Sequence, residues 1–252
     1  MTKHHLKNMA TPDVYSLPKK SKKYVIRPKQ GRKFEESVSI GVLLRDFLKL
    51  ATNEREATIM LNNKDVLVNQ KVVKDKKFSA GYFDVISIKS INKNYTLLPS
   101  KHKFNIQEIS PEMSQQIFLK ITNILPQTKN KQQIVFNNGY AILSERKVKV
   151  GDTAIIDAKA KKIKGLVSLK EGALILSTKG AHIGQIGRIS KIETDIVLLD
   201  NSIKTIEKNI IVVPEEYASI VSSDGKSENA SVVSGEVIAS KTDDISKGGK
   251  NE

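Results

Sequence analysis

The sequence has no cysteine and no tryptophan, and aromatic residues make up only 5% of its 252 residues. Without cysteine, the chain cannot form disulfides, thiolate metal sites or a cysteine nucleophile. The scarcity of aromatic side chains also argues against a large ligand pocket lined by aromatic rings. These absences exclude many redox and metal-binding classes.

The usual signals for zinc, membranes and catalysis are also missing. No run of about 18 apolar residues occurs, and the basic N-terminus lacks the apolar segment of a secretory signal. The motifs GxxxxGK(S/T), HExxH and GxSxG do not occur. We therefore predict a cytoplasmic protein with no catalytic residues, metal, cofactor, membrane contact or small-molecule substrate. No pair among the four histidines has the helical spacing of a zinc site: His4, His5, His102 and His182.

Positive charge is concentrated at the N-terminus. The net charge is +15, and residues 1–33 contain ten Lys or Arg against Asp13 alone, which gives this stretch a charge of +9. Charge of one sign repels itself unless a polyanion is present, so we predict a nucleic acid partner. A solvated basic tail without a specific role is the alternative. The side chains predicted to contact RNA here are Lys3, His5, Lys7, Lys19, Lys20, Lys22, Lys23, Arg27, Arg32 and Lys33.

Composition and periodicity predict an α+β, multidomain fold of five segments. Residues 1–38 form a basic segment without periodicity, predicted to be an extended arm that orders only on a partner. A small α+β module (39–98) and a β-rich central domain (99–170) follow. Five short strands with glycine corners suggest an SH3-like β-barrel over 171–214, and a polar, periodicity-free disordered tail is expected over 215–252.

The α+β module carries the clearest local patterns. The spacing of the apolar residues predicts a first helix, with Arg45 and Lys49 on its more exposed side. These apolar residues are Ile40, Leu43, Leu44, Phe47 and Leu48. Asn53 is the expected N-cap of a second helix, with Glu56 three residues on. KDVLVNQKVVKD reads as two strands around Asn69-Gln70, and AGYFDVISI (80–88) as one closing strand. The basic side chains predicted to face RNA here are Arg45, Lys49, Lys64 and Lys71, with solubilising surface charge as the alternative.

Shorter sequence signals for turns and helix starts occur in the segments after residue 98. Ser110, Pro111 and Glu112 predict the start of a capped helix, and Asn138-Gly139 predicts a hairpin. The stretch KGAHIGQIGR (179–188) combines three glycines with Lys179, His182 and Arg188, which could place donors around a phosphate. A glycine-bent corner between strands is the plainer reading, and the two are compatible.

The order of these motifs resembles the archaeal and eukaryotic small-subunit ribosomal protein S4e family. The resemblance covers roughly residues 3–213 and is carried by HLKNMATP (5–12), RPKQGRKFEESVSIGVLLRDFLKLA (27–51), SAGYFDVISI (79–88) and STKGAHIGQIGRISKI (177–192). It implies that the α+β module is an S4-type RNA-binding domain and that the glycine-rich loop is a KOW motif. It further implies a ribosomal component that binds rRNA and neighbouring small-subunit proteins and catalyses nothing.

The chain departs from the family pattern at single positions. Asn8 stands where the family usually has Arg, Lys179 where it has Gly, and His182 where it has Asn. Two other hypotheses stay open. One is an RNA-modifying enzyme that carries an S4-type module, and the other is an assembly or transcription factor with a KOW loop.

Overall fold

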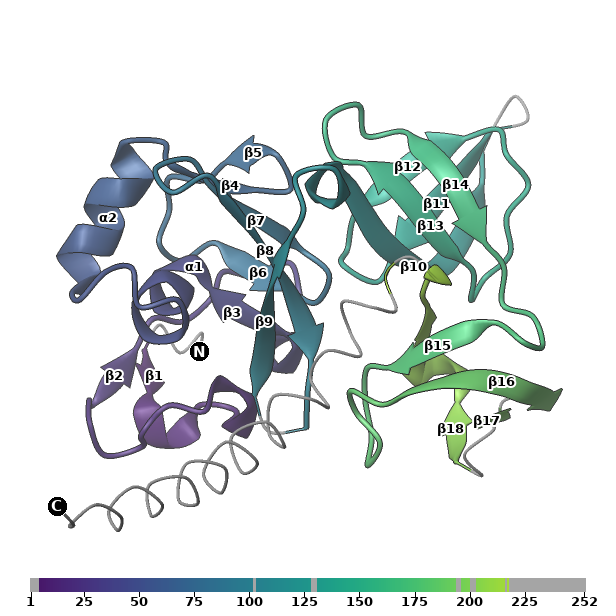
Figure 1. Ribbon diagram of the computed structural model, residues 1–252, viewed down its shortest axis with the longest axis horizontal. Coiled ribbons are helices and arrows are strands. Elements are labelled where there is room, and N and C mark those ends of the chain that lie inside the picture. Colours follow the sequence, from purple (N-terminus) through teal and green to yellow (C-terminus); the bar gives the residue numbers. More distant parts are fainter. Residues whose placement is uncertain are drawn as a thin grey trace, which may run out of the picture.

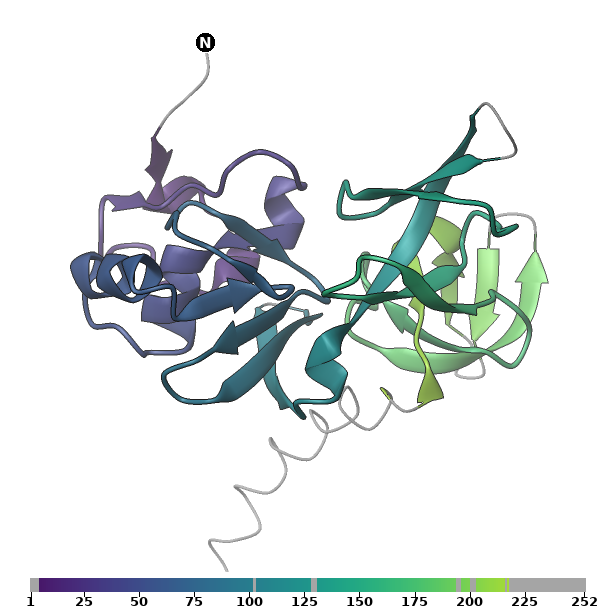
Figure 2. The same cartoon turned by 90° about the horizontal axis from the view of Figure 1, so that it is seen from above.

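β-Strands dominate the fold. The computed structural model describes residues 5–101, 103–127, 131–193, 196–199, 203–215 and 217, and within them the strands form five sheets with few helices. The N-terminal unit, residues 5–109, lies beside two β-rich units (Figure 1). Its helices lie on the side away from the β-rich half in both views (Figure 1, Figure 2). The α+β expectation therefore holds only for the N-terminal unit.

The N-terminal unit is built on a five-stranded sheet in the order β5-β4-β7-β8-β9. Its strands are β4 (Val66–Val68), β5 (Lys71–Val72), β7 (Val85–Ile88), β8 (Lys93–Pro99) and β9 (Phe104–Ile109). Two ribbons accompany this sheet: β1 (Leu6–Lys7) with β2 (Tyr24–Val25), and β3 (Ser37–Ser39) with β6 (Ser79–Gly81). Because β8 and β9 pair along their length, this sheet runs past the predicted segment boundary at residue 98.

The two helices predicted in the α+β module form, but the first one ends early. It comprises α1 (Ile40–Val42) and a π-helical turn (Leu43–Phe47), and Ile40, Leu43 and Leu44 are fully buried as the apolar spacing predicts. The predicted exposed side is wrong for Arg45, whose side chain is only 9% exposed. Lys49 is exposed but lies beyond the helix, with a φ of 53°.

The second helix, α2 (Glu54–Asn62), begins after Asn53 as predicted. Glu56 reaches back to the preceding turn, where its carboxylate accepts hydrogen bonds from the backbone N–H and the hydroxyl of Thr52. The turn at Asn69-Gln70 is also confirmed, with φ values of 50° and 62° that match a two-residue hairpin. Both signals are local in sequence, which is why the sequence alone identifies them.

The closing strand is two strands rather than one. Residues 80–88 divide between β6 and β7, which belong to different sheets. The chain reverses between them because Phe83 adopts a positive φ of 63° and Asp84 binds the backbone N–H of Gly81. Because the residues of AGYFDVISI are mostly buried in both strands, the sequence pattern does not reveal the break between them.

The structure contradicts the prediction that residues 1–36 order only on a partner. Residues 5–36 fold onto the N-terminal unit, where Leu6, Tyr15 and Val25 join its hydrophobic core. Tyr15 is 1% exposed, and its hydroxyl donates to the carbonyl of Ser37 at 2.8 Å. Sparse apolar anchors, rather than a periodic face, hold this segment, so periodicity arguments missed them.

The central sheet and the C-terminal sheet each contain five strands. The central sheet has the order β12-β11-β10-β13-β14, and the C-terminal sheet has the order β18-β17-β16-β15-β19. The central strands are β10 (Gln116–Pro126), β11 (Gln132–Phe136), β12 (Ala141–Ser144), β13 (Thr153–Asp157) and β14 (Ile163–Val167). The C-terminal strands are β15 (Leu174–Ser177), β16 (Ile186–Glu193), β17 (Ile196–Leu199), β18 (Lys204–Ile206) and β19 (Ile210–Val212).

These strands fall where the sequence places them. The Asn138-Gly139 hairpin is confirmed, with a Gly139 φ of 79°, whereas the predicted helix after Ser110 is wrong. Only a single 3-10 turn, Met113–Gln115, forms there. The SH3-like closure of the C-terminal sheet and the five-segment division stay predictions.

Three hydrophobic clusters match the three units, and the first extends beyond its own sheet. It includes Phe118, Leu176 and Tyr217 from the later units. Tyr217 packs on Phe118 with ring centroids 4.5 Å apart and lies 1% exposed. The expected tail boundary at 215 is therefore too early, and residues 218–252 lie outside the described part of the chain.

A buried carboxylate ties the N-terminal segment to the sheet. Asp84 is fully buried, and the Nη2 atom of Arg32 lies 2.7 Å from both of its oxygens. The amide of Asn69 donates to the same carboxylate at 2.8 Å and accepts from the backbone N–H of Val85. Asp84 therefore joins the N-terminal segment, the β4–β5 turn and the β6–β7 turn.

We expect Arg32→Met to destabilise the fold by about 3–5 kcal/mol, because Asp84 would stay buried without its cation. The free energy of unfolding in urea measures this loss. Lys20→Met removes the same charge from an exposed position and should change stability by less than about 0.5 kcal/mol. Equal losses in the two variants would contradict a structural role for Arg32.

Candidate nucleic-acid interface

The predicted RNA contacts divide into exposed cations and cations that the fold itself uses. The described candidates whose side chains are exposed include His5, Lys7, Lys20, Lys23, Lys33, Lys49, Lys64 and Lys71. Lys22, Arg27 and Arg188 are also exposed and interact with other groups of the chain. Lys3 lies outside the described residues.

The β1–β2 ribbon presents its cations on one face. Leu6 pairs with Val25 and both face the core, whereas Lys7 pairs with Tyr24 and both are exposed. Lys23 precedes Tyr24, and its ammonium lies 5.5 Å from the centroid of the tyrosine ring. The ribbon lies at the outer edge of the N-terminal unit (Figure 1).

Three predicted RNA contacts from the N-terminal unit have internal partners instead. Arg32 binds the buried Asp84. Arg45 donates to Asp46, with Nη2 and Oδ2 2.6 Å apart, and this hydrogen bond raises the pKa of the guanidinium. The Nζ atom of Lys19 donates to the carbonyl of Thr11 at 2.7 Å and lies 3.3 Å from Asp13. The first role of these three side chains is therefore to stabilise the fold.

The Lys64 and Lys71 side chains lie together beside the β4–β5 hairpin. Both are exposed and line one shallow surface hollow with Val72, Lys74 and Phe78. Lys64 has a φ of 61°, which places it in the turn after α2 rather than on a strand. The sequence predicts both residues near the turn, and the structure adds Lys74 to them.

The glycine-rich loop joins β15 to β16 and packs against the N-terminal unit. Lys179 forms an ion pair with Glu36, and this hydrogen bond raises the pKa of the lysine. Gly184 has a φ of 83°, and a Cβ there would lie 2.9 Å from the carbonyl oxygen of Pro99. A Cβ at position 187 would lie 2.3 Å from the Leu199 side chain, so the glycine at this position permits close packing.

The other two polar side chains of this loop differ in exposure. Arg188 is exposed and lies 3.1 Å from Glu215, and His182 is half-buried. The plainer reading of the loop, a glycine-bent corner, is thus confirmed as part of its role. Contact between its side chains and RNA stays a prediction.

A buried lysine that the sequence reading missed connects the central and C-terminal sheets. The Nζ atom of Lys120 on β10 donates to the backbone carbonyls of Glu207 and Ile210, at 2.5 and 2.9 Å. Burial lowers the pKa of Lys120 to about 8. A lysine inside the apolar run QIFLKI is the sequence signal, because a charge in such a run needs an internal partner.

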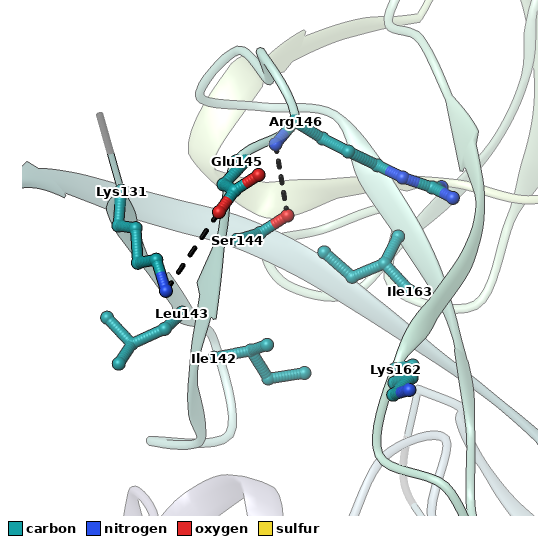
Figure 3. A pocket seen from close by; sticks show the side chains of 8 residues that line it. All are labelled: Lys131, Ile142, Leu143, Ser144, Glu145, Arg146, Lys162 and Ile163. Atoms are coloured by element: carbon teal, nitrogen blue, oxygen red, sulfur yellow. Dashed lines mark hydrogen bonds and ion pairs between the residues drawn. The ribbon is translucent and has the colours of Figure 1, made fainter. Parts of the chain in front are cut away.

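One pocket lies between the two outer strands of the central sheet (Figure 3). Ile142 on β12 points toward Ile163 on β14, Leu143 points to the other side of β12, and Lys131, Arg146 and Lys162 also line the pocket (Figure 3). Its one carboxylate, Glu145, lies 3.9 Å from Lys131, so the lining lacks the paired acids of general acid–base catalysis.

Among the described residues, no group of three or more His, Asp or Glu side chains is placed to hold a metal ion. No helix in the described part of the chain is long and apolar enough to cross a membrane.

Family models match two regions of the chain. The model described as ribosomal family S4e matches residues 91–163, and the model described as the RS4NT (NUC023) domain matches residues 2–31. The second match covers the basic N-terminal segment, which the structure shows folded against the core from residue 5 onward.

Individual relatives match nearly their whole length. The small ribosomal subunit protein eS4 of Methanosphaera stadtmanae is 32% identical over 226 residues, which cover 85% of this chain and 94% of the relative. The protein of the same name from Korarchaeum cryptofilum is 33% identical over 84% of this chain and 94% of its own length. The crystal structure of the 30S ribosomal protein S4e from Thermoplasma acidophilum matches with a TM-score of 0.64 at 29% identity, covering 71% of this chain and 95% of that chain.

We expect Gly184→Ala to cost more stability than Gly172→Ala, although both glycines have a φ near 83°. Gly172 faces open space, so its substitution costs about 1–2 kcal/mol from backbone strain alone. Gly184→Ala adds a clash with Pro99 and should also loosen the contact between the loop and β8. Urea unfolding measures both losses, and equal values would show that the loop does not pack on Pro99.

We expect the pH dependence of stability to depend on Lys120. Its folded pKa of about 8 lies below the unfolded value of about 10.4, so the unfolded chain binds more protons between these two values. The free energy of unfolding should therefore rise by up to about 3 kcal/mol from pH 8 to 10.5. Lys120→Met should lack this part of the rise, and parallel urea-unfolding profiles for the two proteins would refute the assignment.

Proposed function

The chain belongs to ribosomal family S4e, and on that premise we propose that it is a structural component of the small ribosomal subunit that binds ribosomal RNA and supports translation. The observation that carries this proposal is the match to small ribosomal subunit proteins over 94% of their length at 32–33% identity. The match of residues 2–31 to the RS4NT (NUC023) domain model supports a role for the basic N-terminal segment in this function.

The exposed cations of the N-terminal unit are the proposed contacts to RNA. Lys7, Lys20 and Lys23 extend from the β1–β2 ribbon and its connection. Lys64 extends from the turn after α2, and Lys71 extends from the β4–β5 hairpin. Ammonium groups neutralise phosphates without reading sequence, so these contacts fix position and orientation on folded RNA. Arg32 and Lys179 are assigned primarily to the fold, because each already pairs with a carboxylate.

We also propose where the protein works and which partners it contacts. A structural component of the small subunit works in the ribosome and lies against small-subunit rRNA and neighbouring ribosomal proteins. The two other hypotheses, an RNA-modifying enzyme and an assembly or transcription factor, gain no support from a specific side-chain arrangement among the described residues. They remain as outcomes of the test below.

Sucrose-gradient sedimentation of a native lysate, with and without a high-salt wash, tests the proposal. We expect the protein to migrate with mature small subunits at about one copy each and to resist the salt wash. Migration only in the free pool, or only with immature subunits, would instead identify a factor or an enzyme.

Removing exposed cations should weaken RNA binding and its salt dependence together. The combined variant Lys7→Gln, Lys20→Gln and Lys23→Gln should reduce the slope of log affinity against log salt by about 2–3, since each phosphate contact contributes about 0.7–0.9. Filter binding to small-subunit rRNA over a salt series measures this slope.

A matched variant controls for net charge. Lys29, Lys76 and Lys93 each pair with a carboxylate on the protein surface, and changing all three to Gln removes the same charge. This control should change the slope by less than 1. Equal effects of the two variants would show that total charge, and not the ribbon, determines binding.

A further inference from the structure

We propose that the outward face of the β1–β2 ribbon holds one unpaired nucleotide, with its base stacked on the ring of Tyr24. This inference rests on the proposed function and specifies the ligand of one part of the interface. It goes beyond phosphate binding, because the recognised group is a nucleobase. The key residues are Tyr24, His5, Lys7 and Lys23.

The register of the ribbon places these side chains together. Lys7 lies directly opposite Tyr24, so their side chains share the outward face while Leu6 and Val25 face the core. His5 is two residues before Lys7, which returns it to the same face, and its ring centroid lies 5.6 Å from that of Tyr24. The rings of His5 and Tyr24 and the side chains of Lys7 and Lys23 therefore lie on one small surface.

Tyr24 is the more exposed of the two exposed tyrosines, whereas three of the six tyrosines of the chain are buried. Its exposed fraction is 49%, whereas Tyr15, Tyr82 and Tyr217 are between 1% and 7% exposed. Tyr24 therefore contributes little to the core, and about half of its surface is accessible to a ligand. The hydrophobic core does not require an aromatic residue at this position.

The neighbouring charges fit a nucleotide better than an apolar ligand. The Lys23 ammonium lies 5.5 Å from the Tyr24 ring centroid, close enough to meet the phosphate of a nucleotide stacked there. Lys7 and Lys20 are exposed on the ribbon and its connection and can neutralise adjoining phosphates. Because bases within a duplex are stacked on one another, the base that reaches Tyr24 must be unpaired.

Binding of the full chain to two oligoribonucleotides tests this inference. One is a ten-residue oligoadenylate, and the other is an abasic ribose-phosphate oligomer of the same length and charge. We expect wild type to prefer oligoadenylate, and Tyr24→Ala to weaken oligoadenylate binding by about 5- to 150-fold while leaving the abasic oligomer unchanged. Tyr24→Phe should retain wild-type affinity, because stacking needs the ring and not the hydroxyl.

Tyr140 provides a matched control. It is 36% exposed and lies in the hairpin between β11 and β12, away from the ribbon. Tyr140→Ala should leave both affinities unchanged. Because the chain has no tryptophan, quenching of tyrosine fluorescence by oligoadenylate gives a second readout, which should be lost in both Tyr24→Ala and Tyr24→Phe and retained in Tyr140→Ala.

The possible results separate this inference from the proposed function. Wild-type binding that Tyr24→Ala does not weaken would overturn the stacking site and leave the ribosomal function standing. An equal loss for both oligomers would also overturn it, since a loss of phosphate binding or folding would then explain the effect. Failure of wild type to bind either oligomer or small-subunit rRNA would overturn both.

Discussion

The buried carboxylate of Asp84 is the constraint on which the N-terminal unit depends. It holds Arg32, Asn69 and the backbone of Gly81 at one point, and these residues come from three distant stretches of the chain. A buried charge without partners costs several kcal/mol, so any arrangement that removes one donor is disfavoured. This requirement explains why the basic N-terminal segment folds back on the sheet despite its high charge.

The cations of the described residues fall into two groups. The cations that pair with Asp84 and Glu36 hold distant segments together, and cations on the β1–β2 ribbon and the β4–β5 hairpin remain exposed. A protein that binds a polyanion needs both, because exposed cations repel one another and require a rigid support. The internal ion pairs supply this support where they are shielded from solvent.

The contacts between units include polar and close-packed contacts beside the apolar cluster that they share. Lys179 meets Glu36, the backbone at Gly184 lies against Pro99, and Lys120 donates to carbonyls beside β19. Such contacts specify geometry, since glycine spacing and hydrogen-bond direction tolerate little displacement. The glycine-rich loop therefore orients the C-terminal sheet relative to the N-terminal unit, whether or not its side chains also meet RNA.

The sequence by itself determined the local elements and the class of partner. The face of the first helix, the Asn69-Gln70 and Asn138-Gly139 turns and the short strands after residue 170 follow from spacing within a few residues. Charge density predicted a polyanion as the partner. Only the tertiary structure decided that Arg32 points to Asp84, that Tyr15 and Tyr217 are buried while Tyr24 is exposed, and that Lys120 lies between two sheets. The physical reason is that a lysine, arginine or tyrosine has the same local pattern in both settings, and its role depends on which distant group it meets.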